Sequence, residues 1–423
     1  MPHTRREFLK ASLGASTAAA LGPAVPAFLS RSALAAPPRP NDAETVLVVV
    51  QLAGGNDGLN TVVPYEDDEY HRTRPTLRAV ARDVHKIDSQ LGFHPRMGAF
   101  LRLYKEGHLS VVQGVGYPNP DGGHFESMRN WQTARPHEAD CQTGWLGRAL
   151  DHVWRADEAD VPAAFVGQIA QPFTLNGEKV IVPSIRSLEE GTLRAMPGAG
   201  NGGAAQQRLT RAAVLSRTAD RNPLLDFVAR GTQAAGDASR RIEAVARARK
   251  AAGPTGYPPI QFAQMLRVVA GLIRADLGIR IYYTELGGAE PGGFDNHANQ
   301  LGNHCALLEQ LSESVAAFVD DLQRQGLLDR VLLMTFSEFG RTVQENGRRG
   351  TGHGSAAPVF LAGGKLKGGL VGKHPNLTDL ENGGQRFHTD FRRLYATALD
   401  RWLGFDSRAV LGEPFEPLDL LDV

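Results

Sequence analysis

Acidic and imidazole side chains recur in this chain just after short apolar runs, in turns that are rich in glycine or in polar residues. In chain order they are Asp57, His124, Asp295, His297, Glu338 and His353. Carboxylate oxygens and imidazole nitrogens are the donors that divalent metals take from proteins. These residue types therefore predict a divalent metal site, for Zn, Mn, Mg or Ca, where the turns meet.

The apolar runs that precede the turns predict the elements that would position them. The runs are Val46 to Leu52, Leu109 to Val115, Ile279 to Leu286 and Arg330 to Phe336. Continuous Val, Ile and Leu are typical of strands buried on both faces, as in a parallel sheet covered by helices. The predicted fold class is therefore α/β, with three α/β/α layers and a mostly parallel central sheet. Ligands bind beyond the carboxyl ends of such strands, so we expect the turns to meet at one edge.

Two of the turns carry carboxylates that allow more than one interpretation. Asp57, in the glycine-rich turn after the first run, is either a metal ligand or the cap of the next helix. Asp295 and His297 stand two residues apart, and side chains at this spacing in an extended turn point the same way. They can thus face one ion, although an ordinary turn with a solvated histidine has the same pattern.

Glu338 directly follows a buried strand, where a carboxylate is costly unless it is paired or binds a metal. Arg341, three residues on, is either its salt-bridge partner or the group that holds an anionic ester by a bidentate contact. His353 and His124 each stand beside glycines, which leave room for a ligand to approach the imidazole.

The first 35 residues are predicted to be a twin-arginine signal peptide and not part of the fold. Thr4 to Lys10 (TRREFLK) fills every position of the export motif, and Ala33 to Ala35 supplies small residues for cleavage. We therefore expect the twin-arginine machinery to export the chain to the periplasm or the cell exterior.

Charge and cysteine content narrow the classes of function. Lys and Arg together number 46, as do Asp and Glu, so the charge balance does not favour a nucleic-acid partner or a charged membrane surface. After the leader, no run is long and apolar enough to predict a transmembrane segment. Cys141 and Cys305 either pair or stay free, and without C-x-x-C spacing they are not a zinc site.

Composition also divides the chain. Residues 41–150 and 279–423 alternate apolar runs with helical patterns, and they are predicted to form the α/β core. Residues 151–278 include a Gly- and Ala-rich stretch, followed by a segment rich in Ala, Arg and Leu at helical spacing. We expect this part to be a helical and loop insertion that covers one face of the core.

Five stretches of the chain, taken together, are similar to the exported domain-of-unknown-function family 1501. They are VQLAGGNDGLNTVVPY, GYPNPDGGHFESMRNWQTA, GGFDNHANQ, MTFSEFGRT and GTGHGSAAPVFLAGG, and they span most of the chain after residue 45. The fold of this family resembles that of the alkaline phosphatase and sulfatase superfamily. Enzymes of that superfamily hold one or two divalent metals at the ends of parallel strands and hydrolyse phosphate or sulfate esters.

The resemblance implies roles for particular residues. Those that fit the superfamily's order of metal ligands are Asp57, Asp295, His297, Glu338 and His353. His124 would act as general acid or base, and Arg341 would neutralise the anion. The superfamily's nucleophile normally stands ahead of the turn that holds His124, but the sequence there, PNPDGG, has no hydroxyl. Ser127 is the nearest candidate nucleophile and Thr61 is another, whereas water activated by the metal is the alternative.

Two hypotheses of function follow. The first is an exported, metal-dependent hydrolase of phosphate or sulfate esters, with a small anionic ester as its partner. The second is a non-catalytic binding or assembly module on the same fold, with a co-exported protein as its partner. The missing nucleophile favours the second hypothesis, and the acidic and imidazole groups after the strands favour the first.

Replacement of both arginines in the export motif tests the leader. The double change Arg5→Lys and Arg6→Lys should leave the protein in the cytoplasm, because the twin-arginine machinery recognises the arginine pair. Fractionation of cells that express the wild type or the double mutant measures this. Unchanged recovery of the double mutant from the periplasm would contradict the prediction.

Overall fold

The computed structural model describes most of the chain after the leader. The described residues are 45–153, 163–180, 182–185, 256–288 and 293–423. The contacts divide the chain into two units, residues 1–43 with 154–160 and residues 44–153 with 161–423, and the described residues belong to the second. The predicted signal peptide lies outside them. Among the described residues, no helix is both long and apolar enough to cross a membrane.

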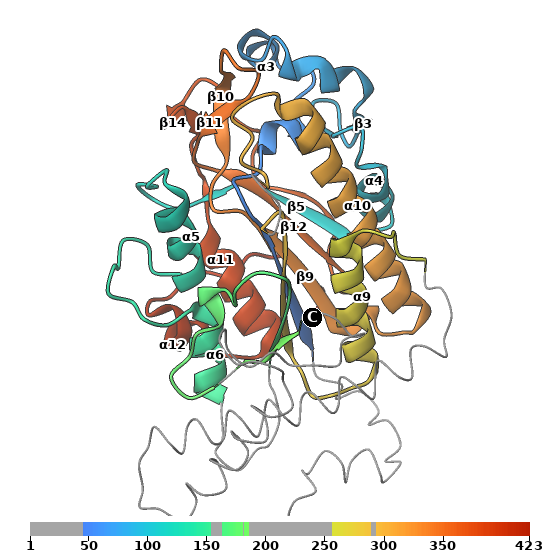
Figure 1. Ribbon diagram of the computed structural model, residues 1–423, viewed down its shortest axis with the longest axis vertical. Coiled ribbons are helices and arrows are strands. Elements are labelled where there is room, and N and C mark those ends of the chain that lie inside the picture. The colour runs from blue at the N-terminus through green and yellow to red at the C-terminus, as the bar shows by residue number, and fades with distance from the viewer. Residues whose placement is uncertain (1–44, 154–162, 181, 186–255, 289–292) are drawn as a thin grey trace, which may run out of the picture. The chain divides into compact units, whose positions relative to one another are not determined.

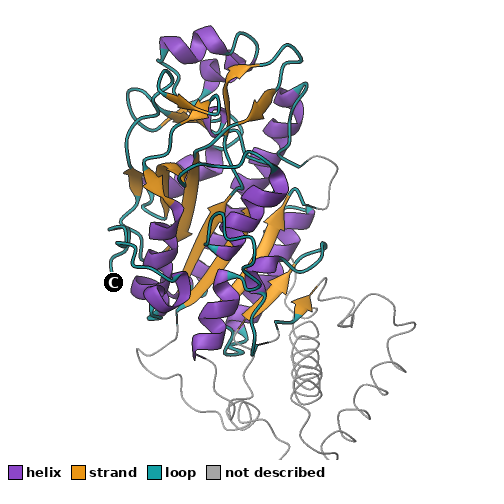
Figure 2. Cartoon of the chain, turned by 90° about the vertical axis from the view of Figure 1, so that its left-hand side faces the viewer, coloured by secondary structure: helices purple, strands orange, loops and turns teal. Residues whose placement is uncertain are grey.

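A nine-stranded sheet runs through this unit (Figures 1 and 2). Its strands are β1 (Val46–Leu52), β5 (Leu109–Gly116), β6 (Ala163–Val166), β7 (Ser184–Ile185), β8 (Ile281–Leu286), β9 (Val331–Phe336), β12 (Ala357–Gly363), β13 (Gly369–Val371) and β16 (Thr389–Asp390). Their order is β13-β5-β12-β9-β1-β8-β6-β7, with β16 beside β5. Among these described strands, β12 runs antiparallel to β5 and β9, and the other pairs are parallel. The predicted mostly parallel sheet is therefore confirmed.

Helices cover one face of the sheet through alternate residues of the strands. These helices are α4 (Gly98–Lys105), α9 (Gln261–Arg274) and α10 (Gln300–Arg324). Val46, Val48, Val50 and Leu52 of β1 belong to one buried cluster with apolar side chains of all three helices. The residues of β1 between them are also buried, which is why the strand has no polar alternation.

The opposite face carries α5 (His124–Thr133), α6 (Trp145–Val153), α11 (Phe391–Ala396) and α12 (Ser407–Leu411) (Figure 1). A π-helical segment, Thr397–Leu403, continues α11. Trp131 of α5 stacks on Phe336 of β9 at 5.4 Å and on Phe391 of α11 at 4.3 Å between ring centroids. Large aromatic side chains thus fix this layer on the sheet, and the three-layer α/β/α prediction is confirmed.

Smaller sheets lie beyond the main one. One contains β10 (Arg341–Glu345), β11 (Thr351–His353), β14 (Leu380–Glu381) and β15 (Gly384–Gln385). The other contains β2 (Val62–Val63), β3 (His85–Lys86) and β4 (Gly92–Phe93), and α3 (Asp68–Thr73) follows β2 in the chain. In the antiparallel pair of β10 with β11, Arg341 lies opposite His353, which brings two of the candidate residues together.

The boundary of the predicted insertion needs a correction. Strands β6 and β7 fall within residues 151–278, which we expected to hold only helices and loops, yet β6 pairs with β8 and extends the main sheet. Helix α9, from the same segment, packs on α10 and on β8. Both ends of the segment therefore contribute to the core, whereas residues 186–255 lie outside the described part of the chain. Cys141 and Cys305 are free thiols in this structure.

Candidate metal centre

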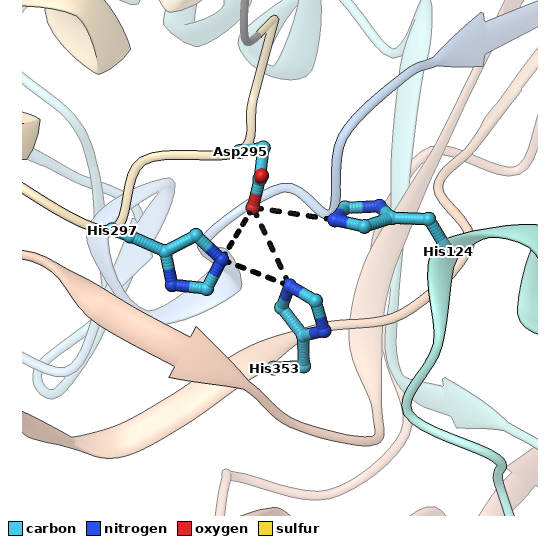
Figure 3. Close-up of side chains that lie close together, drawn as sticks. All are labelled: His124, Asp295, His297 and His353. Carbon is cyan, nitrogen blue, oxygen red and sulfur yellow. Dashed lines mark hydrogen bonds and ion pairs between the residues drawn. The ribbon is translucent and has the colours of Figure 1, made fainter.

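Four side chains bring a compact set of donor atoms together (Figure 3). They belong to His124, Asp295, His297 and His353, and one donor atom from each lies within 4.8 Å of the others. His124 opens α5, Asp295 and His297 follow β8, and His353 ends β11. Each of the four side chains keeps between 24% and 39% of its surface exposed, so a ligand can reach the group.

The spacing of these donors suits a metal ion. Nε2 of His297 lies 2.9 Å from Oδ1 of Asp295 and 3.0 Å from Nε2 of His353. Nε2 of His353 is 3.4 Å from the same carboxylate oxygen. Bonds of about 2.0–2.1 Å to a tetrahedral ion would place its ligand atoms roughly 3.3 Å apart. The three donors can therefore bind one ion with little rearrangement.

Two of the imidazoles are oriented through their other ring nitrogen. Nδ1 of His353 lies 2.6 Å from the carbonyl oxygen of Gly122. A carbonyl oxygen accepts only, so Nδ1 of His353 carries the proton and Nε2 presents its lone pair to the centre. Nδ1 of His124 lies 3.0 Å from Oε1 of Glu338. A carbonyl partner such as that of His353 is typical of histidines that bind metals, and a carboxylate partner fixes the ring of His124 in the same way.

Glu338 is thus placed behind an imidazole and outside the donor group. Its buried carboxylate also accepts a hydrogen bond from the backbone N–H of Gly54 at 2.8 Å. The hydrogen bond with Glu338 is the main cause that raises the pKa of His124, against a smaller opposing effect of burial. For His353, burial lowers the pKa.

Asp295 is held in place by Arg341. The guanidinium donates a hydrogen bond of 2.7 Å to Oδ1 of Asp295. Partial burial raises the pKa of Asp295, but the hydrogen bond and the charge of Arg341 outweigh it, so the pKa is lowered overall. The carboxylate is therefore kept ionised, as a metal ligand must be.

Arg341 was expected either to pair with Glu338 or to hold an anionic ester, and the structure places it in neither position. Its side chain has no exposed surface, and it also donates to the carbonyl oxygens of Gly54, Gly55 and Phe294. Its ion-pair partner is Asp295, not Glu338, and its donors point at protein groups instead of an open cavity. Arg341 thus connects the turns after β1 and β8 to β10.

Phe339 supports the centre, although no pattern in the sequence indicated this role. Its ring packs against His353 at 4.4 Å and against His124 at 4.9 Å between centroids, and only 2% of the residue is exposed. A Cβ on Gly55, whose φ is +79°, would lie 2.3 Å from this ring. Glycine at position 55 therefore leaves room for the ring of Phe339, which packs against both imidazoles.

Asp57 lies outside the donor group. Both of its oxygens accept hydrogen bonds from the guanidinium of Arg74, at 2.6 and 2.9 Å, and Gln300 donates to one of them. Arg74 and Asp57 are both buried, so the pair is shielded from solvent. A cationic side chain occupies the place that we expected a metal to take.

The candidate nucleophiles are placed unfavourably. Ser127 lies in the first turn of α5, near His124, and it is completely buried. The hydroxyl of Thr61 is also buried and donates to the backbone carbonyl of Asp57 at 2.7 Å. Neither hydroxyl is exposed to a substrate in this conformation.

A family model described as "Protein of unknown function (DUF1501)" matches residues 44–416. The chain belongs to this family. The family that the sequence motifs indicated is thereby confirmed. Among the curated proteins, a search found none similar to this DUF1501 chain.

Several solved structures are distantly similar to this DUF1501 protein. The C-terminal periplasmic domain of EcEptC from Escherichia coli shows 11% identity and a TM-score of 0.37, over 88% of this chain and 87% of that one. The PsFucS1 sulfatase from Pseudoalteromonas sp. shows 10% identity and a TM-score of 0.36, over 89% and 71%. The lipoteichoic acid synthase LtaP from Listeria monocytogenes shows 10% and 0.34, over 82% and 76%. At these scores the likeness says nothing about the chemistry of the DUF1501 centre.

Substitution of one imidazole tests the metal centre. His297→Ala removes a donor that lies near both Asp295 and His353, so we expect metal affinity to fall at least about tenfold. Elemental analysis of the folded protein after loading and desalting measures the ion bound per chain. His374→Ala is the matched control, because His374 lies in a loop and its Nδ1 faces the carbonyl of Pro375. Equal metal content in the two variants would contradict the assignment.

Substitution of Asp57 separates structural pairing from metal binding. Asp57→Asn leaves Arg74 buried without its counter-charge, which should cost about 3–5 kcal/mol of unfolding free energy. Metal content should stay at the wild-type level. Chemical denaturation and elemental analysis measure the two effects.

The same substitution should also change the acid sensitivity of the fold. Burial raises the pKa of Asp57, but the charge and hydrogen bonds of Arg74 lower it by more than burial raises it. The pKa of Asp57 in the folded protein therefore lies below 3.8. The stability that the pair contributes is therefore present above pH 3.8 and is lost as the pH falls through the folded pKa. Asp57→Asn should lack this acid-dependent loss, and a stable variant without metal would instead support Asp57 as a ligand.

Proposed function

We propose that this chain is an exported, metal-dependent hydrolase of phosphate or sulfate esters. The observation that carries the proposal is the convergence of Asp295, His297 and His353 on one point, with donor separations of 2.9 to 3.4 Å. Catalytic metal sites commonly use three protein ligands and leave a further position open. The partial exposure of these side chains supports such an open position.

The donor set also narrows the choice of metal. Mg²⁺ and Ca²⁺ prefer oxygen ligands, whereas imidazole nitrogen suits Zn²⁺ and other transition metals. Two imidazoles and one carboxylate therefore favour Zn over Mg, Ca or Mn at this site. A divalent ion held there would polarise the ester and lower the pKa of a bound water.

His124 is the residue that we assign to proton transfer. Its Nε2 faces the centre, 3.4 Å from Oδ1 of Asp295, while its Nδ1 is held by the carboxylate of Glu338. A carboxylate in this place fixes the orientation of the ring and stabilises its protonated form. Nε2 of His124 can thus give a proton to the leaving oxygen of an ester that lies over the centre.

One observation favours the alternative, a non-catalytic binding or assembly module. The hydroxyls of Ser127 and Thr61 are buried, so neither supports the covalent mechanism known in the superfamily that the family resembles. The hydrolase proposal therefore depends on the metal and His124, and not on a serine or threonine nucleophile. Export by the twin-arginine route is part of the same proposal and rests on the leader motif.

Activity assays with three proteins test the proposed function. Metal-loaded wild type should hydrolyse at least one aryl phosphate or aryl sulfate. His124→Ala should lower kcat by about 10²- to 10⁴-fold while metal content is kept, because the proton donor is lost. Ser127→Ala should keep near-normal activity, provided that it folds, because its hydroxyl lies in the buried part of α5.

Each opposite result has a distinct meaning. If the metal-replete protein turns over no phosphate, sulfate or phosphonate ester, the binding-module hypothesis replaces the hydrolase. If His124→Ala loses its metal together with its activity, His124 is a fourth ligand and not the proton donor. If folded Ser127→Ala is inactive, a displaced serine nucleophile operates.

A further inference from the structure

The turn between β10 and β11, residues 346–350, is closed by hydrogen bonds of its first residue, Asn346. Oδ1 of Asn346 accepts hydrogen bonds from the backbone N–H groups of Arg348 at 2.9 Å and of Gly350 at 3.2 Å. The backbone N–H of Asn346 donates to the carbonyl of Gly350 at 2.9 Å. The turn is thus closed by its own first residue, and the position of the backbone at Arg348 is well defined.

The same turn is bonded to the segment that carries His297. Nδ2 of Asn346 donates to the carbonyl of His297 at 3.0 Å, and the backbone N–H of Asn299 donates to the carbonyl of Arg348 at 2.9 Å. The contact is so close that a Cβ on Gly350 would lie 2.3 Å from the carbonyl carbon of His297. Arg348 is therefore fixed through its backbone next to one of the metal-ligand candidates.

An open cavity of about 450 Å³ lies at this junction. It is lined by His297, Asn346, Gly347 and Arg348. Arg348 is exposed, and within the described part of the chain no carboxylate forms an ion pair with it. The guanidinium is thus available to a ligand, in contrast to that of Arg341, which is enclosed by protein groups.

We propose that Arg348 and this cavity form an oxyanion subsite beside the metal centre. The inference rests on the proposed function, because it assigns the anionic part of the ester to a place in the structure. A guanidinium presents N–H groups in a planar fork that matches two oxygens of a phosphate or sulfate group. The ligand would lie over His297, with its acidic group toward Arg348.

Arg348, and not Arg341, is the arginine that can meet the anion. Arg341 was the expected neutralising group, but its N–H groups are used by carbonyls and by Asp295. Arg348 supplies the same chemistry on the open side of His297. Arg341 therefore holds the turns at the strand ends, and Arg348 faces the ligand.

Binding of inorganic phosphate and sulfate to the metal-loaded protein tests the subsite. Calorimetric titrations would compare wild type with Arg348→Gln and with Arg349→Gln. Arg349 is the matched control, because it is exposed in the same turn but does not line the cavity. Both changes remove one positive charge, so long-range electrostatic effects are similar. We expect Arg348→Gln to weaken binding about tenfold and Arg349→Gln less than about twofold.

A second variant keeps the test informative if Arg348→Gln folds poorly. Arg348→Lys retains the charge but loses the planar fork, so it should bind phosphate with intermediate affinity. Equal losses for Arg348→Gln and Arg349→Gln would overturn the subsite, because they would indicate general electrostatic attraction. Wild-type affinity in both Arg348 variants, or no binding of either anion to the wild type at millimolar concentration, would also overturn it.

The result can be distinguished from a failure of the proposed function. If phosphate binding depends on Arg348 but the wild type hydrolyses no ester, the hydrolase proposal fails and the subsite stands. If the wild type hydrolyses esters while Arg348→Gln keeps the wild-type phosphate affinity and KM, the subsite alone fails.

Discussion

A buried guanidinium determines how the strand ends are arranged. The side chain of Arg341 has no exposed surface, so its N–H groups need partners inside the protein. These partners are the carbonyls of Gly54, Gly55 and Phe294 and the carboxylate of Asp295. The turns after β1 and β8 are consequently fixed against β10, and the carboxylate is aimed at the imidazoles. Arg341 thus adds to the backbone hydrogen bonds that also join these turns, such as that from the N–H of Phe294 to the carbonyl of Ala53.

Features that depend on neighbouring residues could be predicted from the sequence. The continuous apolar runs predict β1, β5, β8 and β9, because burial on both faces is visible within each run. The spacing of Asp295 and His297 predicts that they face one point, since alternation acts over two residues. The apolar residues of α10 recur at helical spacing, so the sequence likewise predicts which face of this helix is buried.

Features that depend on distant segments could not be predicted in the same way. A carboxylate after a strand looks alike in the sequence whether its partner is a metal, a guanidinium or an imidazole. Only the tertiary structure shows that Asp57 pairs with Arg74 and that Glu338 supports His124. Strand β7 has only two residues, which is too short for a periodic pattern. Its place in the sheet therefore could not be predicted from the sequence either.

The donor group joins parts of the chain that are far apart in sequence. His353 contacts the carbonyl of Gly122 across 231 residues and His297 across 56. An ion held here would act as a reversible cross-link, because it would close long loops that the unfolded chain leaves open. The free energy of unfolding would then rise with the logarithm of the free metal concentration. The folded fraction of the protein would therefore depend on how much metal its surroundings supply.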